Sequence, residues 1–193
     1  MNIGLYFGTF NPIHLAHLIS AEQIRQGLAL DQVLFVPSAR PPHKSPDGIV
    51  DPEHRYQMAK LAVADNPYFF VSRIEINRKG PSYAIQTIQD LKKHYGPRCE
   101  LSWIIGSDSL IEFKIWKDYD RLLDMCQFVA INRPEYPLSE VPPDIMKRVK
   151  TFKIPFMQIA ATDIRKHIRF GQSIRYLVPL AVVDYIQQHK LYH

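Results

Sequence analysis

Cysteine is scarce in this sequence of 193 residues, and the two cysteines, Cys99 and Cys126, stand far apart. Neither belongs to a CxxC pair or to another spacing typical of metal ligands. This scarcity excludes a disulfide-stapled scaffold and favours a reducing compartment. We therefore expect a cytoplasmic protein whose thiols stay reduced.

The sequence also lacks a long apolar run and a secretion signal. No stretch is long and apolar enough to cross a bilayer. Residues 1–7 have neither a basic start nor a small-residue cleavage site, so we expect a buried strand there rather than a signal peptide. Both absences argue against a membrane partner.

Two familiar nucleotide-binding patterns are missing as well. The sequence has no GxGxxG fingerprint and no GxxxxGK[ST] loop, so dinucleotide-cofactor and P-loop interpretations have no support. What is present is the composition of an ordinary globular protein, with 46% hydrophobic and 22% charged residues. The net charge of +5 fits an anionic ligand, which a nucleotide, a nucleic acid or a membrane surface would each satisfy.

Strand-like apolar runs alternate with helical patterns along the chain. Strands are predicted at 3–7, 33–37, 69–76, 101–105 and 128–132, and helices at 15–28, 54–64, 83–91, 119–125, 144–149, within 160–169 and at 182–189. This alternation predicts an α/β fold with a parallel sheet covered by helices. We expect one domain over 1–193, in which 158–193 form a small C-terminal helical cap with a helix-start signal at Thr162 or Asp163.

Ligands of such sheets bind at the carboxyl ends of the strands, and Gly8 and Gly106 both follow predicted strands. The stretch 37–48 is too rich in proline and polar residues for a regular element, so we expect a long loop beside one strand end. Long loops of this kind are often functional.

The segment from Gly8 to His17 carries the strongest chemical signal. A strand that ends in a glycine and runs into a helix offers flexible backbone and free amides at a positive helix end, which suits a phosphate. His14 and His17 follow on one helix face, and each can donate an N–H to a phosphoryl oxygen. A metal pair and ordinary packing are the alternatives, but no third ligand at a suitable spacing is identifiable.

With these residues in view, the sequence resembles the (T/S)xGH-type nucleotidyltransferases, and within them the nicotinate-nucleotide adenylyltransferases of bacterial NAD biosynthesis. Further matching segments occur in the family's order and approximate spacing. They are Pro41-Pro42-His43-Lys44, Ser82-Tyr83, 105–110 followed by Trp116, Asn132-Arg133-Pro134, 162–165 and 173–179. The likeness therefore covers nearly the whole chain.

The resemblance implies a Rossmann-like, doubly wound fold and a reaction of nicotinate mononucleotide with ATP and magnesium that gives deamido-NAD and pyrophosphate. It implies catalytic contacts to the ATP phosphates from His14, His17, Lys44 and Arg165. It implies that ATP is also bound by Gly8, Thr9, Phe10, Gly106, Asp108, Arg133 and Thr162. The implied pyridine pocket consists of Ser82, Tyr83, Ala84, Trp116 and Lys117, and no metal is expected to be held by the protein itself.

Elementary chemistry agrees with this assignment. In-line attack of a phosphate on the α-phosphorus needs no covalent intermediate, so catalysis reduces to holding two anions together and neutralising the departing pyrophosphate. Several roles stay open at this stage. Asp108 can bind a ribose or, like Ser107, cap a helix; Trp116 can stack on a pyridine ring or lie in the core; and Lys117 can be simply solvated.

The sequence departs from the family pattern at a few positions. Family members usually have Asp at Asn11, Ser-Ser at Ala160-Ala161 and Thr at Ala84, so some hydroxyls are missing here. Nicotinamide mononucleotide, phosphopantetheine and cytidylyl transfer are the sister alternatives. From a different class, a non-catalytic nucleotide- or nucleic-acid-binding module would expect basic residues clustered on one face, whereas Lys and Arg are spread along this chain.

Overall fold

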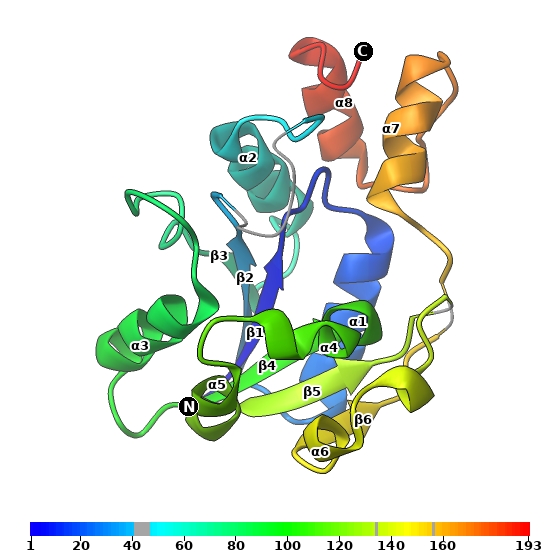
Figure 1. The fold of residues 1–193 in the computed structure, drawn as a ribbon. Coiled ribbons are helices and arrows are strands. Elements are labelled where there is room, and N and C mark those ends of the chain that lie inside the picture. The colour runs from blue at the N-terminus through cyan, green and yellow to red at the C-terminus, as the bar shows by residue number, and fades with distance from the viewer. Residues whose placement is uncertain (41–46, 134, 156) are drawn as a thin grey trace.

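A computed structural model describes residues 1–40, 47–133, 135–155 and 157–193. Six parallel strands form one sheet in the order β3-β2-β1-β4-β5-β6 (Figure 1). The strands are β1 (Asn2–Gly8), β2 (Gln32–Pro37), β3 (Phe69–Val71), β4 (Glu100–Gly106), β5 (Gln127–Ile131) and β6 (Val149–Phe152). This order is that of a Rossmann-like sheet, so the predicted doubly wound fold is confirmed.

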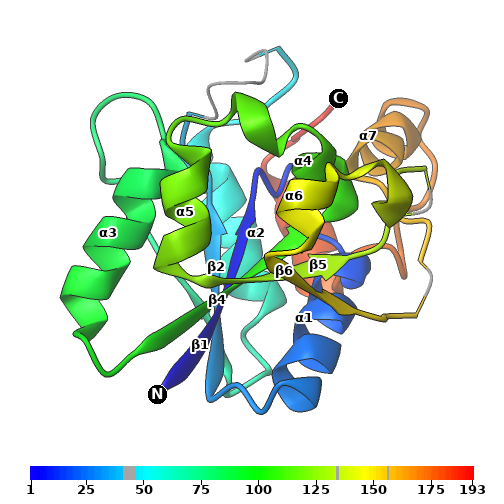
Figure 2. The same ribbon diagram turned by 60° about the horizontal axis from the view of Figure 1, so that its bottom comes forward.

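Helices cover both faces of the sheet (Figures 1 and 2). One face carries α1 (Leu15–Gly27), α2 (Pro52–Ala62), α7 (Ala161–Arg169) and α8 (Leu180–Gln188). The other carries α3 (Ala84–Tyr95), α4 (Ser107–Ile111), α5 (Tyr119–Met125) and α6 (Pro143–Met146). Within the described residues, no helix is both long enough and apolar enough to span a membrane.

The strands supply both cores because successive side chains point to opposite faces. In β1, Leu5 packs towards α3 and α5, whereas its neighbour Tyr6 packs towards α1 and α2. In β5, Phe128 and Val129 divide between the same two faces. Strands buried on both sides read as the continuous apolar runs seen in the sequence.

The chain turns in opposite directions from β1 and β4, which lie side by side in the middle of the sheet. β1 leads outward to β2, and β4 leads outward to β5 on the other side. Ligands of doubly wound sheets bind at this point of reversal, outside the carboxyl ends of the strands. Gly8 ends β1 and Gly106 ends β4, so both lie at that point.

Several predicted element boundaries were wrong. The strand expected over 69–76 stops at Val71, since the chain then turns and the amide of Asn77 donates to the carbonyl of Arg73. The helix expected over 144–149 ends at Met146, because Val149 already pairs with Phe128 as the start of the edge strand β6. That strand was not predicted.

The expected helix caps were wrong too. α7 begins at Ala161 with Ala160 as its N-cap and no side-chain cap bond, so neither Thr162 nor Asp163 starts it. A helix at Ser107 or Asp108 was one of the open alternatives, and α4 does follow β4 directly, but its N-cap is Gly106, so neither Ser107 nor Asp108 caps it. In both helices, no N-cap side chain accepts a hydrogen bond from the backbone amides of the first turn.

The C-terminal helices share a core with the rest of the chain. Ile164, Val182 and Ile186 are fully or almost fully buried in the cluster that also contains Tyr6 and Phe35. The amide of Leu15, the first residue of α1, donates to the carbonyl of Leu177 at 2.9 Å. The region predicted as a cap at 158–193 is thus packed on α1 and α2 by shared apolar contacts.

One buried arginine organises the segments that follow β1 and β2. Arg55 of α2 has no solvent exposure. Its guanidinium donates to four backbone carbonyls, those of Val50 (3.0 Å), Thr9 (2.7 Å), Ser38 (2.6 Å) and Ala39 (3.2 Å). Burial lowers the pKa of Arg55 from its ordinary value, and these charge-assisted hydrogen bonds offset the lost hydration.

Replacement of this guanidinium should be costly. We expect Arg55→Met to lower the free energy of unfolding by about 3 kcal/mol or more, because four partly buried carbonyls lose a charged donor and the methionine cannot replace it. Urea unfolding followed by circular dichroism measures this loss. Lys60→Met, an exposed cation on the same helix, is the matched control and should leave the midpoint nearly unchanged. Equal midpoints for the two variants would contradict this role of Arg55.

Candidate functional site

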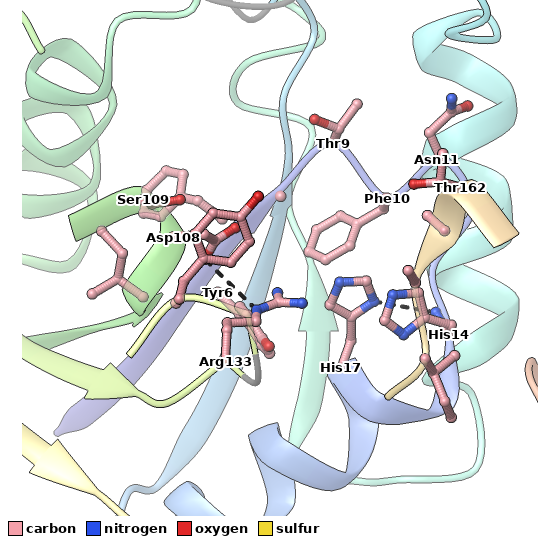
Figure 3. Close-up of a pocket in the computed structure, with 18 of the residues that line it drawn as sticks. Tyr6, Thr9, Phe10, Asn11, His14, His17, Asp108, Ser109, Arg133 and Thr162 are labelled. Atoms are coloured by element: carbon pink, nitrogen blue, oxygen red, sulfur yellow. Dashed lines mark hydrogen bonds and ion pairs between the residues drawn. The ribbon is translucent and has the colours of Figure 1, made fainter. Parts of the chain in front are cut away.

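A cavity of about 490 Å³ opens at the carboxyl ends of β1 and β4 (Figure 3). The predicted phosphate and nucleotide residues that line it are Gly8, Thr9, Phe10, His14, His17, Gly106, Asp108, Arg133, Thr162 and Arg165. The structure thus brings together residues from the beginning, middle and end of the chain. Lys44, which was predicted to join them, lies outside the described residues.

The two histidines stack on each other at the start of α1. Their ring centroids are 3.6 Å apart with 23° between the ring planes. His14 is the N-cap of the helix in an extended backbone conformation, and His17 stands one turn further on. The predicted common face is therefore present, and both rings line the same cavity wall.

The tautomer of His17 follows from one hydrogen bond. The backbone amide of His14 donates to Nδ1 of His17 at 3.2 Å. Nδ1 must then carry a lone pair, so the neutral ring has its proton on Nε2. Nε2 of His17 is consequently an N–H donor, as phosphate binding requires.

His14 is held neutral by its surroundings. The side chain is only 2% exposed, and burial lowers its pKa to about 3, with a further contribution from the positive charge of Arg133. Its side chain also faces the backbone amide of His17, as the second half of a capping box with the bond from the His14 amide to Nδ1 of His17, although Nδ1 makes no hydrogen bond of ordinary geometry to a described residue. A buried polar atom without a partner beside an open cavity is one that a bound ligand can satisfy.

The turn after β1 depends on Gly8 and Phe10. Phe10 adopts a φ of 49°, in the left-handed region, and its ring folds back over Gly8. A Cβ at Gly8 would lie 2.6 Å from Cε1 of Phe10, so a side chain does not fit. The ring of Phe10 is buried against His17 and Tyr6, which makes the side chain structural while the backbone forms the cavity rim.

Asn11 joins four segments at the edge of the cavity. Its side-chain amide donates to the carbonyl of Gly48 at 2.8 Å, and its Oδ1 accepts from the amide of Val50 and the hydroxyl of Tyr192. Its own carbonyl accepts from the Arg165 guanidinium at 2.8 Å. Arg165, which lines the same cavity as the histidine pair, is therefore held by a backbone oxygen.

Arg133 and Asp108 face each other across the ends of β4 and β5. Nε of Arg133 lies 3.6 Å from Oδ1 of Asp108, and both atoms are buried without a hydrogen bond partner among the described residues. The hydroxyl of Ser107 accepts from the backbone amide of Arg133 at 2.9 Å, which links the two strand ends. Both charged groups line the cavity and have capacity left for a ligand.

A second cavity of about 220 Å³ lies next to the first. Its own wall contains all five residues predicted for the pyridine pocket, among them Trp116, which lines both cavities. The two cavities also share the Gly8–Thr9 turn. Two ligands bound in them would therefore meet at the end of β1.

A helix start and one lysine stand in the wall of this second cavity, together with the carboxyl groups of Glu75 and Glu112. α3 begins at Ala84, and its N-cap Tyr83 makes no side-chain cap bond. The ammonium of Lys117 lies 4.8 Å from the ring centre of Tyr83. The half-buried ring of Trp116 packs on Trp103 and Phe113 while still lining the cavity, so its core and stacking interpretations are compatible.

Some residues of the site were not anticipated from the sequence. Glu75 and Glu112 line the second cavity, and Arg55 and Asn11 hold its framework. Asn11 lies within the predicted Gly8–His17 segment, but its role depends on partners remote in sequence, as does most of the hydrogen bonding of Arg55. Across the part of the chain that is described, no three His, Cys, Asp or Glu side chains form a cluster able to hold a metal ion.

The depressed pKa of His14 predicts acid sensitivity. Below an unfolded pKa of 6.5 the unfolded chain binds a proton that the folded chain refuses until about pH 3, so stability is lost as pH falls. We expect a loss of about 2 kcal/mol between about pH 7 and about pH 5 that is absent in His14→Gln. Urea unfolding at each pH measures the slope. His94→Gln, at an exposed position, should keep the wild-type slope, and an unchanged slope in His14→Gln would refute the assignment.

Comparison with known proteins identifies the family to which this chain belongs. Residues 5–168 match the model of the cytidylyltransferase-like family. A protein of Moorella thermoacetica is 43% identical, with 98% of this chain and 91% of that protein covered, and one of Thermus thermophilus is 45% identical over the whole of both chains. Both carry the name "Probable nicotinate-nucleotide adenylyltransferase".

A solved structure has the same fold. It is the Plasmodium falciparum nicotinic acid mononucleotide adenylyltransferase complexed with NaAD, which superposes with a TM-score of 0.82 at 20% identity over 99% of this chain and 97% of that one. Full-length identity above 40% to the bacterial proteins is the stronger relation. Motif, fold and full-length similarity agree, and the chain belongs to the cytidylyltransferase-like family, among the nicotinate-nucleotide adenylyltransferases.

Proposed function

We propose that the protein transfers the adenylyl group of ATP to nicotinate mononucleotide, forming deamido-NAD and pyrophosphate in the cytoplasm. The observation that carries this proposal is the pair of adjoining cavities that share the Gly8–Thr9 turn. One cavity has the neutral histidine pair, and the other has an aromatic wall and a helix N-terminus. The names of the full-length relatives support the same reaction.

ATP occupies the first cavity in this proposal. Its phosphates lie at the start of α1, where His14, His17 and Arg165 converge. In this proposal Asp108, in the first turn of α4 just past β4, accepts hydrogen bonds from ribose hydroxyls, as acidic groups past strand ends do in such sheets. Lys44 keeps its proposed role as a phosphate ligand on the sequence resemblance.

Nicotinate mononucleotide occupies the second cavity. Trp116 offers a flat face to the pyridine ring. The first-turn amides of α3 and the ammonium of Lys117 provide a positive environment for the ring carboxylate. The phosphate of the mononucleotide then extends towards Gly8 and Thr9, where the two cavities adjoin.

The reaction is a direct displacement. A phosphate oxygen of the mononucleotide forms a bond to the α-phosphorus of ATP, the bond from that phosphorus to the bridging oxygen breaks, and pyrophosphate leaves with the electron pair. The neutral histidines donate hydrogen bonds, and Arg165 contributes a fixed positive charge as charge builds on the leaving group. No side chain needs to form a covalent intermediate.

Magnesium enters this proposal with ATP. Mg²⁺ commonly keeps several waters and binds through substrate phosphates plus one or two carboxylates. When bound, it would neutralise phosphate charge, and we assign no protein-held metal step.

The direct test offers the purified protein Mg²⁺ and either ATP or CTP, with nicotinate mononucleotide, nicotinamide mononucleotide and phosphopantetheine supplied separately. Chromatography of the products and a pyrophosphate assay provide two readouts. We expect deamido-NAD and equimolar pyrophosphate from ATP and nicotinate mononucleotide. Failure to form a dinucleotide from either pyridine mononucleotide would sink the proposed function.

His17 provides a residue-level test. We expect His17→Ala to fold normally and to lose about 100-fold or more in kcat, since a preorganised donor to the reacting phosphates is removed. Steady-state kinetics at saturating substrates measures the loss. His94→Ala, an exposed residue that lines neither cavity, is the control. An unchanged kcat in His17→Ala would show that His17 serves the fold alone.

A further inference from the structure

A large aromatic side chain stands exposed in the wall of the first cavity. Tyr136 follows β5, is 46% exposed, and lines the first cavity but not the second. Among the described residues, its ring packs on no other aromatic ring. An aromatic ring that is open to a cavity in this way is suited to stack on a flat ligand.

The other rings that line the first cavity already have a place in the fold or in the second cavity. Phe7 and Trp116 are shared with the second cavity, where the pyridine ring is proposed to bind. The two histidines stack on each other at the phosphate end. Three further rings are at most 4% exposed, namely those of Tyr6, Phe10 and Trp103. Among the described residues, Tyr136 is therefore the aromatic side chain of this cavity that is left for a base.

Backbone contacts hold Tyr136 beside the proposed ribose position. Its amide donates to the carbonyl of Arg133 at 3.1 Å, and the two residues form an isolated antiparallel bridge. The amide of Arg133 in turn donates to the hydroxyl of Ser107 at 2.9 Å, and its Nε lies 3.6 Å from Oδ1 of Asp108. Tyr136 is thus tied to the ends of β4 and β5, next to the carboxylate proposed to bind the ribose.

The charges of the cavity assign the same end to the base. The phosphate end has the histidine pair and Arg165, whereas Tyr136 adjoins the exposed carboxylate of Glu135, and Arg133 there faces Asp108. Carboxylates repel phosphates but accept a neutral base as a neighbour. The base and the phosphates of ATP are attached to opposite ends of the ribose. A ribose at Asp108 with its phosphates at the start of α1 therefore directs the base away from the histidines.

We propose that Tyr136 is a specificity-determining residue, whose ring stacks on the adenine of ATP. This inference rests on the proposed function, which puts ATP in the first cavity. A purine has two fused rings and overlaps a phenol ring over a larger area than a pyrimidine does, so stacking favours ATP over CTP. Because every base has an aromatic face, the contact does not by itself separate adenine from guanine.

Equilibrium binding tests this contact without turnover. Isothermal titration calorimetry with Mg²⁺ and no mononucleotide gives the Kd of ATP, and competition against ATP gives the Kd of CTP. We expect Tyr136→Ala to weaken ATP binding about 10-fold or more, which is the scale of one lost stack between a base and an aromatic ring. CTP should lose less, so that the preference for ATP over CTP falls about 3-fold or more.

Two further variants separate stacking from other roles. Tyr136→Phe keeps the ring and removes only the hydroxyl, so it should bind both nucleotides as the wild type does. Tyr68→Ala removes a tyrosine of almost equal exposure, 47%, that lines neither cavity, and should leave both Kd values unchanged. Urea unfolding of Tyr136→Ala should match the wild type, because the ring is exposed and the backbone bond to Arg133 is retained.

Steady-state kinetics with saturating nicotinate mononucleotide adds a second readout. The base lies away from the reacting phosphorus, so Tyr136→Ala should raise the KM of ATP and leave kcat nearly unchanged. An unchanged Kd of ATP, equal losses for ATP and CTP, a loss confined to kcat, or the same loss in Tyr136→Phe would overturn the inference.

The outcome for the proposed function is read separately. A wild type that binds ATP but forms no dinucleotide would refute the proposed reaction, while the Kd values would still decide the role of Tyr136. Absence of ATP binding in the wild type would overturn both.

Discussion

The site depends on one buried guanidinium, which donates hydrogen bonds to backbone carbonyls just after the ends of two strands. Parallel strands leave their carboxyl ends open, and the chain after β1 and β2 must turn without a ladder to hold it. Arg55 supplies charged donors to carbonyls on both turns and on the approach to its own helix. No carboxylate neutralises it by direct pairing in the described residues. Backbone dipoles bear the charge, and the turn containing Gly8 and Thr9 is fixed as a result.

The fixed turn lines both cavities, and the site therefore has two sides that meet at Gly8 and Thr9. The first side holds neutral imidazoles and an arginine bound to a backbone oxygen, which suits phosphates that carry their own charge. The second side combines an aromatic wall with a helix start and a buried carboxyl. The first side uses preorganised groups whose polar atoms are only partly satisfied within the protein. The desolvation free energy of these unsatisfied polar atoms is offset only when a ligand bonds to them.

Sequence reasoning succeeded where local chemistry and periodicity coincide. β1, β2, β4 and β5 are apolar runs, and the histidine pair follows a glycine turn, so both the sheet and the first cavity were predictable. β6 was missed because its short segment, Val149 to Phe152, alternates with polar residues at the sheet edge. Arg55, Asn11 and Glu75 were missed because their roles come from tertiary partners, and an arginine within a helical pattern is most simply read as solvated.

The bond between Tyr192 and Asn11 spans 181 positions of the chain. A contact of such sequence separation forms only after the intervening sheet has brought both segments together, because the entropy cost of closing the loop must be met before the contact can contribute to stability. The turn after β1, which lines the first cavity, is thus held in part by a segment that lies far along the chain. Local opening of the segment after α8 would therefore remove one of the contacts that fix the rim of the first cavity.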